Sequence, residues 1–452
     1  MSGIVGIAAA GEDARVERML DRLAHRGRAG RIVLGHPAAT AGVLWPRAQT
    51  DAYAEAPDSI TVRDSAGPGR LAQVEAGPKG ITLTRDQLGV APLYYGRTAD
   101  GKLAFASEVK AMLAVTRDVR ELPPGCFHDG CRQERYSDPQ LPAPIEDTPE
   151  AIAQELRRRL ATAVQECIRI SNGCEVGAWL SGGIDSSTMA ALARPHQNRM
   201  ATFAAGVAGA PDLEYARAAA DFLHTEHHEV IVSPQQMLAA LPAVIYHLES
   251  FDALLVRSSI TNYLVAKVAS QHVPAVLSGE GGDELFAGYA YLQTIAPQEL
   301  PAELLDITGR LHNTALQRVD RSAAAHGLLA HVPFLTPEVL AYALSIPAEC
   351  KLRDGVEKWI LRRAVAGLLP DHVLNRRKAK FWEGAGVSEQ LAAYAEERIS
   401  SGDFHRERRL PNGWELNSKE ELMYYRIFRE HFGDLDELSW MGRTKGATKA
   451  GA

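Results

Sequence analysis

The chain has 452 residues, a formal net charge of −7, 46% apolar residues and 23% charged residues. This balance is typical of a soluble globular protein of two or three domains. The acidic balance argues against nucleic acid and anionic membrane surfaces as partners. No apolar run approaches the roughly 18 residues of a membrane span. The N-terminal segment lacks the basic region of a signal peptide, so we expect a cytoplasmic protein.

The cysteines are few and odd in number, and they form no CxxC pair. They are Cys126, Cys131, Cys167, Cys174 and Cys350. Neither a disulfide framework nor a zinc site is indicated, which fits a reducing compartment.

Residues 1–125 are predicted to form a small β-rich layered domain. Helical patterns occur at 14–27 and 108–115, and short strand patterns occur at 3–10, 41–45, 60–64, 80–86, 92–96 and 102–107. Residues 126–147 are rich in Pro, Gly and Asp and lack periodicity, which is typical of a linker.

Residues 148–435 are predicted to form a second domain. Apolar strand patterns alternate with helical ones up to about residue 282, and the pattern is helical from about residue 300. Such alternation implies a parallel sheet that is covered by helices on both faces. Residues 436–452 are small, basic and unpatterned, so we expect a flexible tail.

A glycine loop at 180–187 follows a predicted buried strand and precedes a helix. Paired glycines let backbone N–H groups approach an anion, and a helix N-terminus and serine hydroxyls add donors. The loop lacks both the Walker A lysine and GxGxxG, so it is interpreted as a different pyrophosphate-binding loop. Asp185 is placed to hold Mg²⁺ that bridges phosphates. The alternative is a glycine turn with a Ser or Asp cap.

A second glycine loop at 277–284 also follows an apolar strand. It brings Glu280 and Asp283 to the same sheet edge as Asp185. Like charges so close are costly unless a cation lies near them, and Mg²⁺ shared by Asp185 and Asp283 would remove that cost. Glu280 would then be free to act as a base. The alternative is a helix N-terminus that favours acidic residues.

The two loops, SGGIDSS and LSGEGGDELFAGY, resemble those of the asparagine synthetase family of ATP-dependent amide ligases. The segments that resemble the family's glutamine-hydrolysing domain are MSGIVGI, AHRGRAG, TRDQLGVAPLYYG and FASEVKAML. The segments that resemble its synthetase domain are RSSITNYLVAKVA, HVPFLTPEVL, EKWILRRAVAGLLP, RRKAKF and NSKEELMYYRIF. The resemblance implies an α/β protein: an N-terminal Ntn-type α+β layered domain, then a doubly wound parallel sheet of the PP-loop ATP pyrophosphatase (HUP-like) type with an α-helical C-terminal part.

The resemblance further implies that MgATP activates a carboxylate as an acyl-adenylate, which ammonia then attacks. It implies Mg²⁺ ligation by Asp185 and Asp283, handling of the amine by Glu280, and charge neutralisation at phosphorus by Lys378. The implied nucleotide contacts are Leu180, Ser181, Gly182, Gly183, Asp185, Ser186, Val207, Ser278 and Gly279. Family members are often dimers, so a homodimer is an option. Without the resemblance, Lys378 would be read as part of a solvated basic run.

The N-terminal domain departs from the family pattern. Ser2 stands where the family has its nucleophilic cysteine, and a hydroxyl is a far weaker nucleophile than a thiol. Residues 30–80 lack the Asn–Gly oxyanion loop and the arginine strand that binds glutamine. We therefore predict a truncated domain without glutaminase activity. Nitrogen would then come from free ammonia or another amine.

The substrate is less well defined than the chemistry. Leu329, His331 and Thr336 replace an acid, an arginine and an aspartate that the family places near the synthetase pocket, which weakens aspartate as the default acceptor. A specialised relative resembling β-lactam synthetase, carbapenam synthetase or a lasso-peptide cyclase is the alternative, although Glu280 departs from the tyrosine of the lactam enzymes. A non-catalytic scaffold is a third hypothesis. The run His227-His228-Glu229 is interpreted as structural, because adjacent strand residues point to opposite faces.

Overall fold

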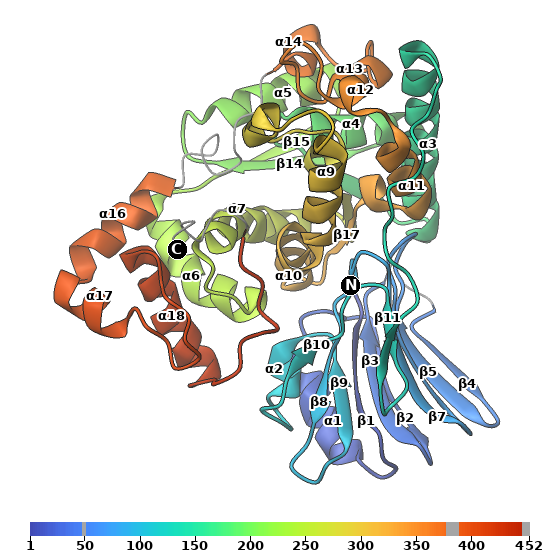
Figure 1. Cartoon of the computed structure of the whole chain (residues 1–452), viewed down its shortest axis with the longest axis vertical. Coiled ribbons are helices and arrows are strands. Elements are labelled where there is room, and N and C mark those ends of the chain that lie inside the picture. Colours follow the sequence, from blue (N-terminus) through green and yellow to red (C-terminus); the bar gives the residue numbers. More distant parts are fainter. Residues whose placement is uncertain (48–50, 377–387, 445–452) are drawn as a thin grey trace.

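The computed structural model describes residues 1–47, 51–376 and 388–444. Two domains are visible in Figure 1, with the N-terminal strands in blue below the larger C-terminal domain. The predicted α/β class is confirmed, because an antiparallel N-terminal domain precedes a parallel sheet with helices. Lys378 lies outside the described residues.

The N-terminal domain is a sandwich of two six-stranded antiparallel sheets. The first sheet, in the order β10-β8-β9-β1-β3-β2, contains β1 (Gly3–Ile7), β2 (Gly30–His36), β3 (Ala39–Trp45), β8 (Tyr94–Arg97), β9 (Leu103–Ala106) and β10 (Arg120–Glu121). The second, in the order β12-β11-β7-β6-β5-β4, contains β4 (Tyr53–Ala56), β5 (Ser59–Asp64), β6 (Ala72–Gly77), β7 (Gly80–Arg85), β11 (Cys126–His128) and β12 (Gln133–Arg135).

Alternating residues of these strands build the core between the sheets. In β6, Ala72, Val74 and Ala76 are buried, whereas Gln73 and Glu75 face outward, as the two-residue period of a strand requires. Helices α1 (Asp13–Arg22) and α2 (Val109–Met112) pack on the first sheet alone. The domain is therefore a three-layer unit in the part of residues 1–147 that the structure describes.

The C-terminal domain is built on a five-stranded parallel sheet in the order β15-β14-β13-β16-β17. Its strands are β13 (Val176–Trp179), β14 (Ala201–Gly206), β15 (Glu226–Ile231), β16 (Ala275–Leu277) and β17 (Leu329–His331). The sequence pattern did not predict β17, because three residues are too few to show a period among helices.

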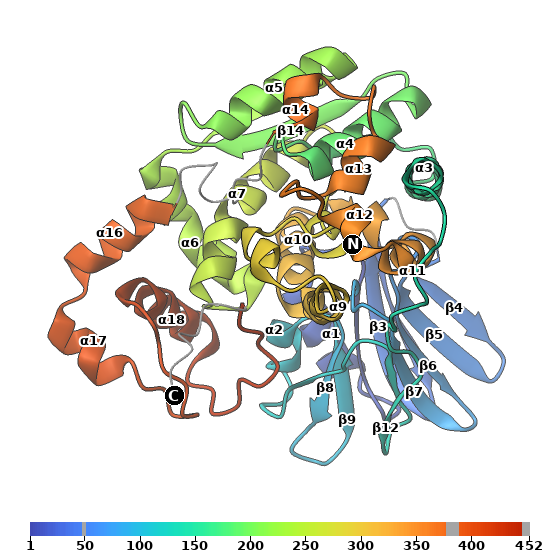
Figure 2. The same cartoon turned by 45° about the horizontal axis from the view of Figure 1, so that its top comes forward.

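Helices cover both faces of this sheet, and Figure 2 shows the last helices of the chain, in orange and red, together on one side of the domain. Helices α4 and α5 lie on one face and α7 and α10 on the other. The helices are α3 (Pro149–Ile170), α4 (Ile184–Ala193), α5 (Pro211–Leu223), α6 (Pro234–Leu248), α7 (Ala253–Ala269), α8 (Gly282–Leu285), α9 (Leu300–Gly309), α10 (Ala315–Ala324), α11 (Pro337–Ser345), α12 (Ala348–Lys351), α13 (Trp359–Ala364), α14 (Asp371–Leu374), α16 (Ser388–Arg398), α17 (Ser401–Glu407) and α18 (Lys419–Phe432).

Two predicted boundaries need correction. Strands β11 and β12 form a hairpin on β7, so the N-terminal domain extends through Arg135 and the linker is shorter than 126–147. The glycines and prolines of this segment mark turns around strands too short to show alternation. The first part of the predicted tail is packed, because Trp440 is buried against Tyr94 and Phe428. Residues 445–452 lie outside the described part.

Among the described residues, no single helix combines the length and hydropathy of a membrane span. Helices α6 and α7 pass that test only as a pair, and they meet at 108°.

A buried ion-pair network joins the two domains. Asp320 in α10 accepts hydrogen bonds from Arg26 Nη1 at 2.8 Å and from Arg70 Nη2 at 2.7 Å, and both arginines belong to the N-terminal domain. Arg26 also bonds Glu108 at 2.6 Å, and Arg70 bonds Asp64. Burial alone would raise the pKa of Asp320, but the charges of Arg26 and Arg70 outweigh it and hold that pKa well below its usual range.

The network continues toward α2. Arg321, next to Asp320, bonds Glu249 at 3.2 Å, and Glu249 accepts the backbone N–H groups of Val109 and Lys110 at 3.1 and 2.7 Å. Lys110 also pairs with Glu249 through its ammonium group at 2.9 Å. Opposite charges thus balance each other across the buried interface.

We expect Asp320→Asn to destabilise the protein by about 3–5 kcal/mol, because it leaves two buried guanidinium groups without their shared carboxylate. Denaturant unfolding measures this change. The matched control is Glu166→Gln, which removes an exposed pair with Arg169 and should cost less than about 1 kcal/mol. Equal losses in the two variants would contradict the role assigned to the network.

Candidate active site

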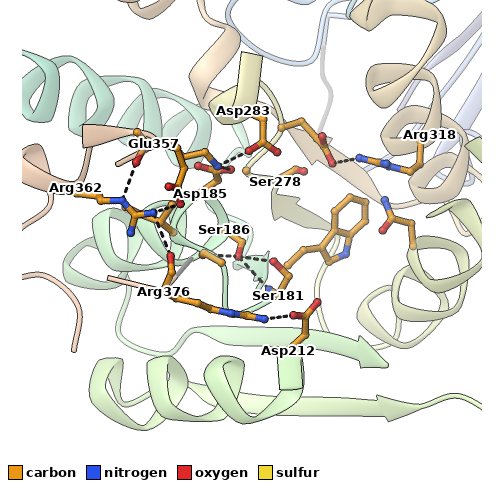
Figure 3. Close-up of a pocket in the computed structure, with 17 residues that line it drawn as sticks. Ser181, Asp185, Ser186, Asp212, Ser278, Asp283, Arg318, Glu357, Arg362 and Arg376 are labelled. Carbon is orange, nitrogen blue, oxygen red and sulfur yellow. Dashed lines mark hydrogen bonds and ion pairs between the residues drawn. The ribbon is translucent and has the colours of Figure 1, made fainter. Parts of the chain in front are cut away.

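A pocket lies at the carboxyl ends of the parallel strands, where the two glycine loops meet (Figure 3). In open α/β sheets this edge is where ligands bind. The pocket is lined by Trp179, Ser181, Gly183, Ile184, Asp185, Ser186, Asp212, Asn262, Ser278, Gly279, Glu280, Asp283, Arg318, Glu357, Lys358, Arg362 and Arg376.

The first loop connects β13 to α4 in a tight turn. Gly182 has a φ of +71°, and a Cβ atom there would lie 2.5 Å from Tyr215 Cβ, so only glycine fits. The Ser186 hydroxyl accepts the N–H of Ser181 at 3.1 Å and donates to the Gly183 carbonyl at 3.1 Å. These bonds hold the loop beside the N-terminus of α4, whose dipole favours an anion.

The second loop, between β16 and α8, lies directly against the first. A Cβ atom on Gly279 would come within 2.6 Å of the Ser186 nitrogen, and one on Gly282 within 2.5 Å of Asp185 Cγ. The glycines of the second loop are therefore needed for its close approach to the first. Asp185 and Asp283 are 98 positions apart along the chain, and this contact brings both into one pocket.

Lys358 lies between these two carboxylates. Its Nζ atom is 2.5 Å from Asp185 Oδ2 and 2.5 Å from Asp283 Oδ1. Burial alone would lower the pKa of Lys358, but the two aspartates outweigh it and raise that pKa, so the ammonium group stays charged. A cation thus separates the two carboxylates, as their proximity requires, and it is supplied by the chain itself.

Glu280 lies at the other side of the pocket, where Arg318 of α10 bonds its Oε1 atom at 2.5 Å. The neighbouring acid Glu284 is buried and accepts the Tyr289 hydroxyl at 2.5 Å. Burial and the charge of Asp283 raise the pKa of Glu284 to about 7. The loop therefore carries three acids close together in sequence, Glu280, Asp283 and Glu284, and Arg318 orients Glu280.

The opposite end of the pocket holds two arginines, each paired with a carboxylate. Arg362 bonds Glu357 at 2.6 Å and donates to the Arg376 carbonyl at 3.1 Å. Arg376 pairs with Asp212 and stacks over Tyr215 at 4.1 Å from the ring centre. Figure 3 shows Arg362 and Arg376 on the side of the pocket away from Arg318.

Most of the site residues predicted from the sequence meet in this pocket. Those that line it are Ser181, Gly183, Asp185, Ser186, Ser278, Gly279, Glu280 and Asp283. Leu180 is fully buried and donates its N–H to the Phe203 carbonyl, and Gly182 packs against Tyr215, so both support the loop from behind. Val207 follows β14 but is not among the lining residues.

Positions 329, 331 and 336, where the family has charged residues near its pocket, are buried in this chain. None of Leu329, His331 and Thr336 lines the pocket. His331 lies beside the Ser171 hydroxyl, with its Nε2 atom 3.0 Å from the Ser171 Oγ atom, and burial lowers its pKa to about 3. These positions belong to β17 and the turn after it, so their side chains pack in the core.

Several pocket residues were not predicted from the sequence. Glu357, Lys358 and Arg362 belong to the motif EKWILRR and Arg376 begins RRKAKF, and the family resemblance of these motifs was a signal. Asn262 lies in RSSITNYLVAKVA, which gave the same kind of signal. Trp179 and Arg318 carry no local signal, because they are distant along the chain and meet only through the packing of β13 and α10.

The N-terminus is enclosed within the first domain. Ser2 is fully buried, and its carbonyl oxygen accepts a hydrogen bond from Arg26 Nε at 2.7 Å. Burial lowers the pKa of the Met1 amino group to about 5. Arg26, with Asp64 and Asp320, thus occupies the space around the position of the family's nucleophile.

Two family models match this chain. The asparagine synthase model matches residues 155–306 and 296–449, and the glutamine amidotransferase domain model matches residues 62–137. Among solved structures, NMN synthetase from Francisella tularensis is 14% identical with a TM-score of 0.30, covering 66% of this chain and 100% of that chain.

Three relatives are similar over most of the chain. Asparagine synthetase (glutamine-hydrolyzing) of Zea mays is 33% identical and matches 78% of this chain and 64% of its own length. A probable asparagine synthetase of Schizosaccharomyces pombe is 34% identical and matches 78% of this chain and 70% of its own length. Asparagine synthetase B of Escherichia coli is 32% identical, over 82% and 70%. The chain thus spans about two thirds of the length of these relatives, and it belongs to the asparagine synthase family.

Proposed function

We propose that this protein is a carbon–nitrogen ligase that activates a carboxylate with ATP as an acyl-adenylate and then joins it to an amine. AMP and pyrophosphate would be released. The observation that carries the proposal is one pocket that has a glycine-loop end bordered by Lys358, Arg362 and Arg376 and, away from Arg362 and Arg376, the carboxylate of Glu280. The first suits a triphosphate and the second suits an amine nucleophile.

The phosphate end would use several donors at once. Backbone N–H groups of the first loop, the N-terminus of α4, and the charges of Lys358, Arg362 and Arg376 all border it. Lys378 follows two residues after Arg376, so its position in the chain is compatible with the role of neutralising charge on phosphorus. Such charges stabilise a transition state in which negative charge develops on the phosphate.

Mg²⁺ fits the carboxylates of this site. Asp185 and Asp283 both line the pocket, and carboxylate oxygens are the ligands that Mg²⁺ prefers. Each carboxylate also contacts Lys358, so the ion would share these ligands with a cation of the chain. When bound, the ion would bridge phosphate oxygens and withdraw charge from them.

Glu280 would take a proton from the attacking amine, because it is the acid on the side away from Lys358. The Arg318 contact orients the Glu280 carboxylate for this step. Free ammonia is the default nucleophile and aspartate the default acceptor, in keeping with the family.

A specialised acceptor is the second candidate, and Trp179 favours it. Its side chain is 8% exposed and lines the pocket. Its buried indole N–H has no hydrogen-bond acceptor among the described residues. A substrate with a polar group could satisfy this donor, whereas leaving it unpaired costs free energy.

The test of the proposal is ATP–pyrophosphate exchange with a panel of carboxylic acids. Exchange with aspartate and ammonia-dependent formation of asparagine would support the default substrate. Exchange with another acid alone would support the specialised ligase. Absence of exchange with every acid would favour the non-catalytic scaffold.

We expect Glu280→Gln to separate the two half-reactions. Amide formation should fall by about 10²-fold or more, since a general base is lost, while pyrophosphate exchange stays near the wild-type rate. Glu175→Gln, at an exposed position, is the control. An equal loss of both half-reactions would refute the assignment of Glu280 to the amine step.

We expect Lys358→Met to reduce pyrophosphate exchange by about 10²- to 10³-fold, because a buried charge beside the phosphates is removed and Asp185 and Asp283 then repel each other. The exchange rate at saturating carboxylate measures the effect. Lys267→Met, which changes an exposed lysine on α7, should keep the wild-type rate. Wild-type exchange in Lys358→Met would show that this lysine has only a structural role.

We also propose that the N-terminal domain has no glutaminase activity, supported by the burial of Ser2 and the Arg26 contact to its carbonyl oxygen. Neither the wild type nor Ser2→Cys should release glutamate from glutamine, because a thiol alone restores neither the oxyanion donors nor room for the substrate. An assay of glutamate checks this expectation. Release by Ser2→Cys at a rate comparable to amide formation with ammonia would contradict it.

A further inference from the structure

Three side chains of metal-binding type meet on the parallel sheet away from the pocket. Glu226 begins β15, and His228, two residues later, points to the same face of that strand. His272 lies in the turn between α7 and β16. Glu226 and His272 stand at the amino ends of β15 and β16, whereas the pocket is at the carboxyl ends. The cluster is therefore separate from the proposed active site.

The three side chains are close enough to share one ion. One ligand atom from each lies within 4.8 Å of the other two. The rings of His228 and His272 have centres 4.0 Å apart, and His228 Nε2 is 3.4 Å from Glu226 Oε1. Ligands of a tetrahedral Zn²⁺ at 2.0–2.1 Å stand about 3.3 Å apart. Glu226 and His272 are exposed, so their side chains can rotate through the remaining distance.

The His228 ring is held in place with its Nε2 atom facing Glu226. Phe203 stacks on it at 5.2 Å with an interplanar angle of 14°. Its Nε2 atom faces Glu226 Oε1 at 3.4 Å, in a geometry that falls short of a hydrogen bond. A metal ion in the cluster would coordinate this atom.

The two oxygen atoms of the Glu226 carboxylate contact different neighbours. Oε2 accepts a hydrogen bond from Arg199 at 2.9 Å, and Oε1 faces His228. Ligating carboxylates are usually oriented in this way by a hydrogen bond to the oxygen that does not face the metal. The Arg199 pair is exposed, so it competes only weakly with an ion.

We propose that Glu226, His228 and His272 bind a divalent transition-metal cation, Zn²⁺ being the best fit. Two imidazoles and one carboxylate are ligands that Zn²⁺ takes, whereas Mg²⁺ and Ca²⁺ prefer oxygen alone. Three protein ligands leave a fourth position for water. The ion would link the edge strand β15 to the turn before β16. Because the cluster is assembled by the fold, the ion stabilises the folded state.

The experiment uses the full chain, stripped with a chelator and titrated with ZnCl₂ by calorimetry. The variants are His272→Ala, at an exposed position where folding is not at risk, and His405→Ala, which removes an exposed histidine on α17 as the matched control. We expect one site in the wild type and in His405→Ala, and an affinity at least tenfold lower in His272→Ala. Equal affinity in all three proteins would overturn the proposal.

Two further measurements use the same proteins. Saturating Zn²⁺ should raise Tm by about 3 °C or more in the wild type and in His405→Ala, but not in His272→Ala. Co²⁺ in place of Zn²⁺ should show the intense visible absorption of a four-coordinate ion. The proposal would also be overturned if the wild type showed only the weak spectrum of hydrated Co²⁺. A Zn²⁺-dependent rise in Tm of the same size in His272→Ala as in the wild type would overturn it as well.

Discussion

The contact of Asp320 with Arg26 and Arg70 is the constraint on which the arrangement of the two domains depends. All three groups are buried, and removing such charges from water is costly unless each is paired. The pairs cross the interface between the domains, so their geometry is satisfied only when the domains are docked. Hydrophobic packing alone would tolerate many relative orientations, whereas these directional bonds select one.

Helix α10 connects this interface to the pocket. Asp320 points from it to the N-terminal domain, and Arg318, two residues earlier, bonds Glu280 in the pocket. Residues two apart on a helix lie on roughly opposite sides. The N-terminal domain therefore fixes the helix that orients the acid of the proposed amine step. This gives a physical reason for the domain to be present even without glutaminase activity.

The pocket balances charge by a similar principle. Two glycine loops approach so closely that Asp185 and Asp283 share a site, and Lys358 lies between them as the compensating cation. The sequence led us to expect a cation there and to assign it to Mg²⁺. The structure places the ammonium group of Lys358 between the carboxylates. A metal ion and Lys358 would then act side by side on the triphosphate.

The sequence by itself determined the two glycine loops, the alternation that builds the parallel sheet, and the pocket residues that belong to those loops. These follow from local rules: strands have a period of two, and only glycine permits the turn at Gly182. Only the tertiary structure decided that Lys358 lies between the aspartates, that Arg318 holds Glu280, and that Leu329 and His331 belong to a core strand. These contacts join residues far apart along the chain, and their energies depend on burial and pairing that local patterns do not encode.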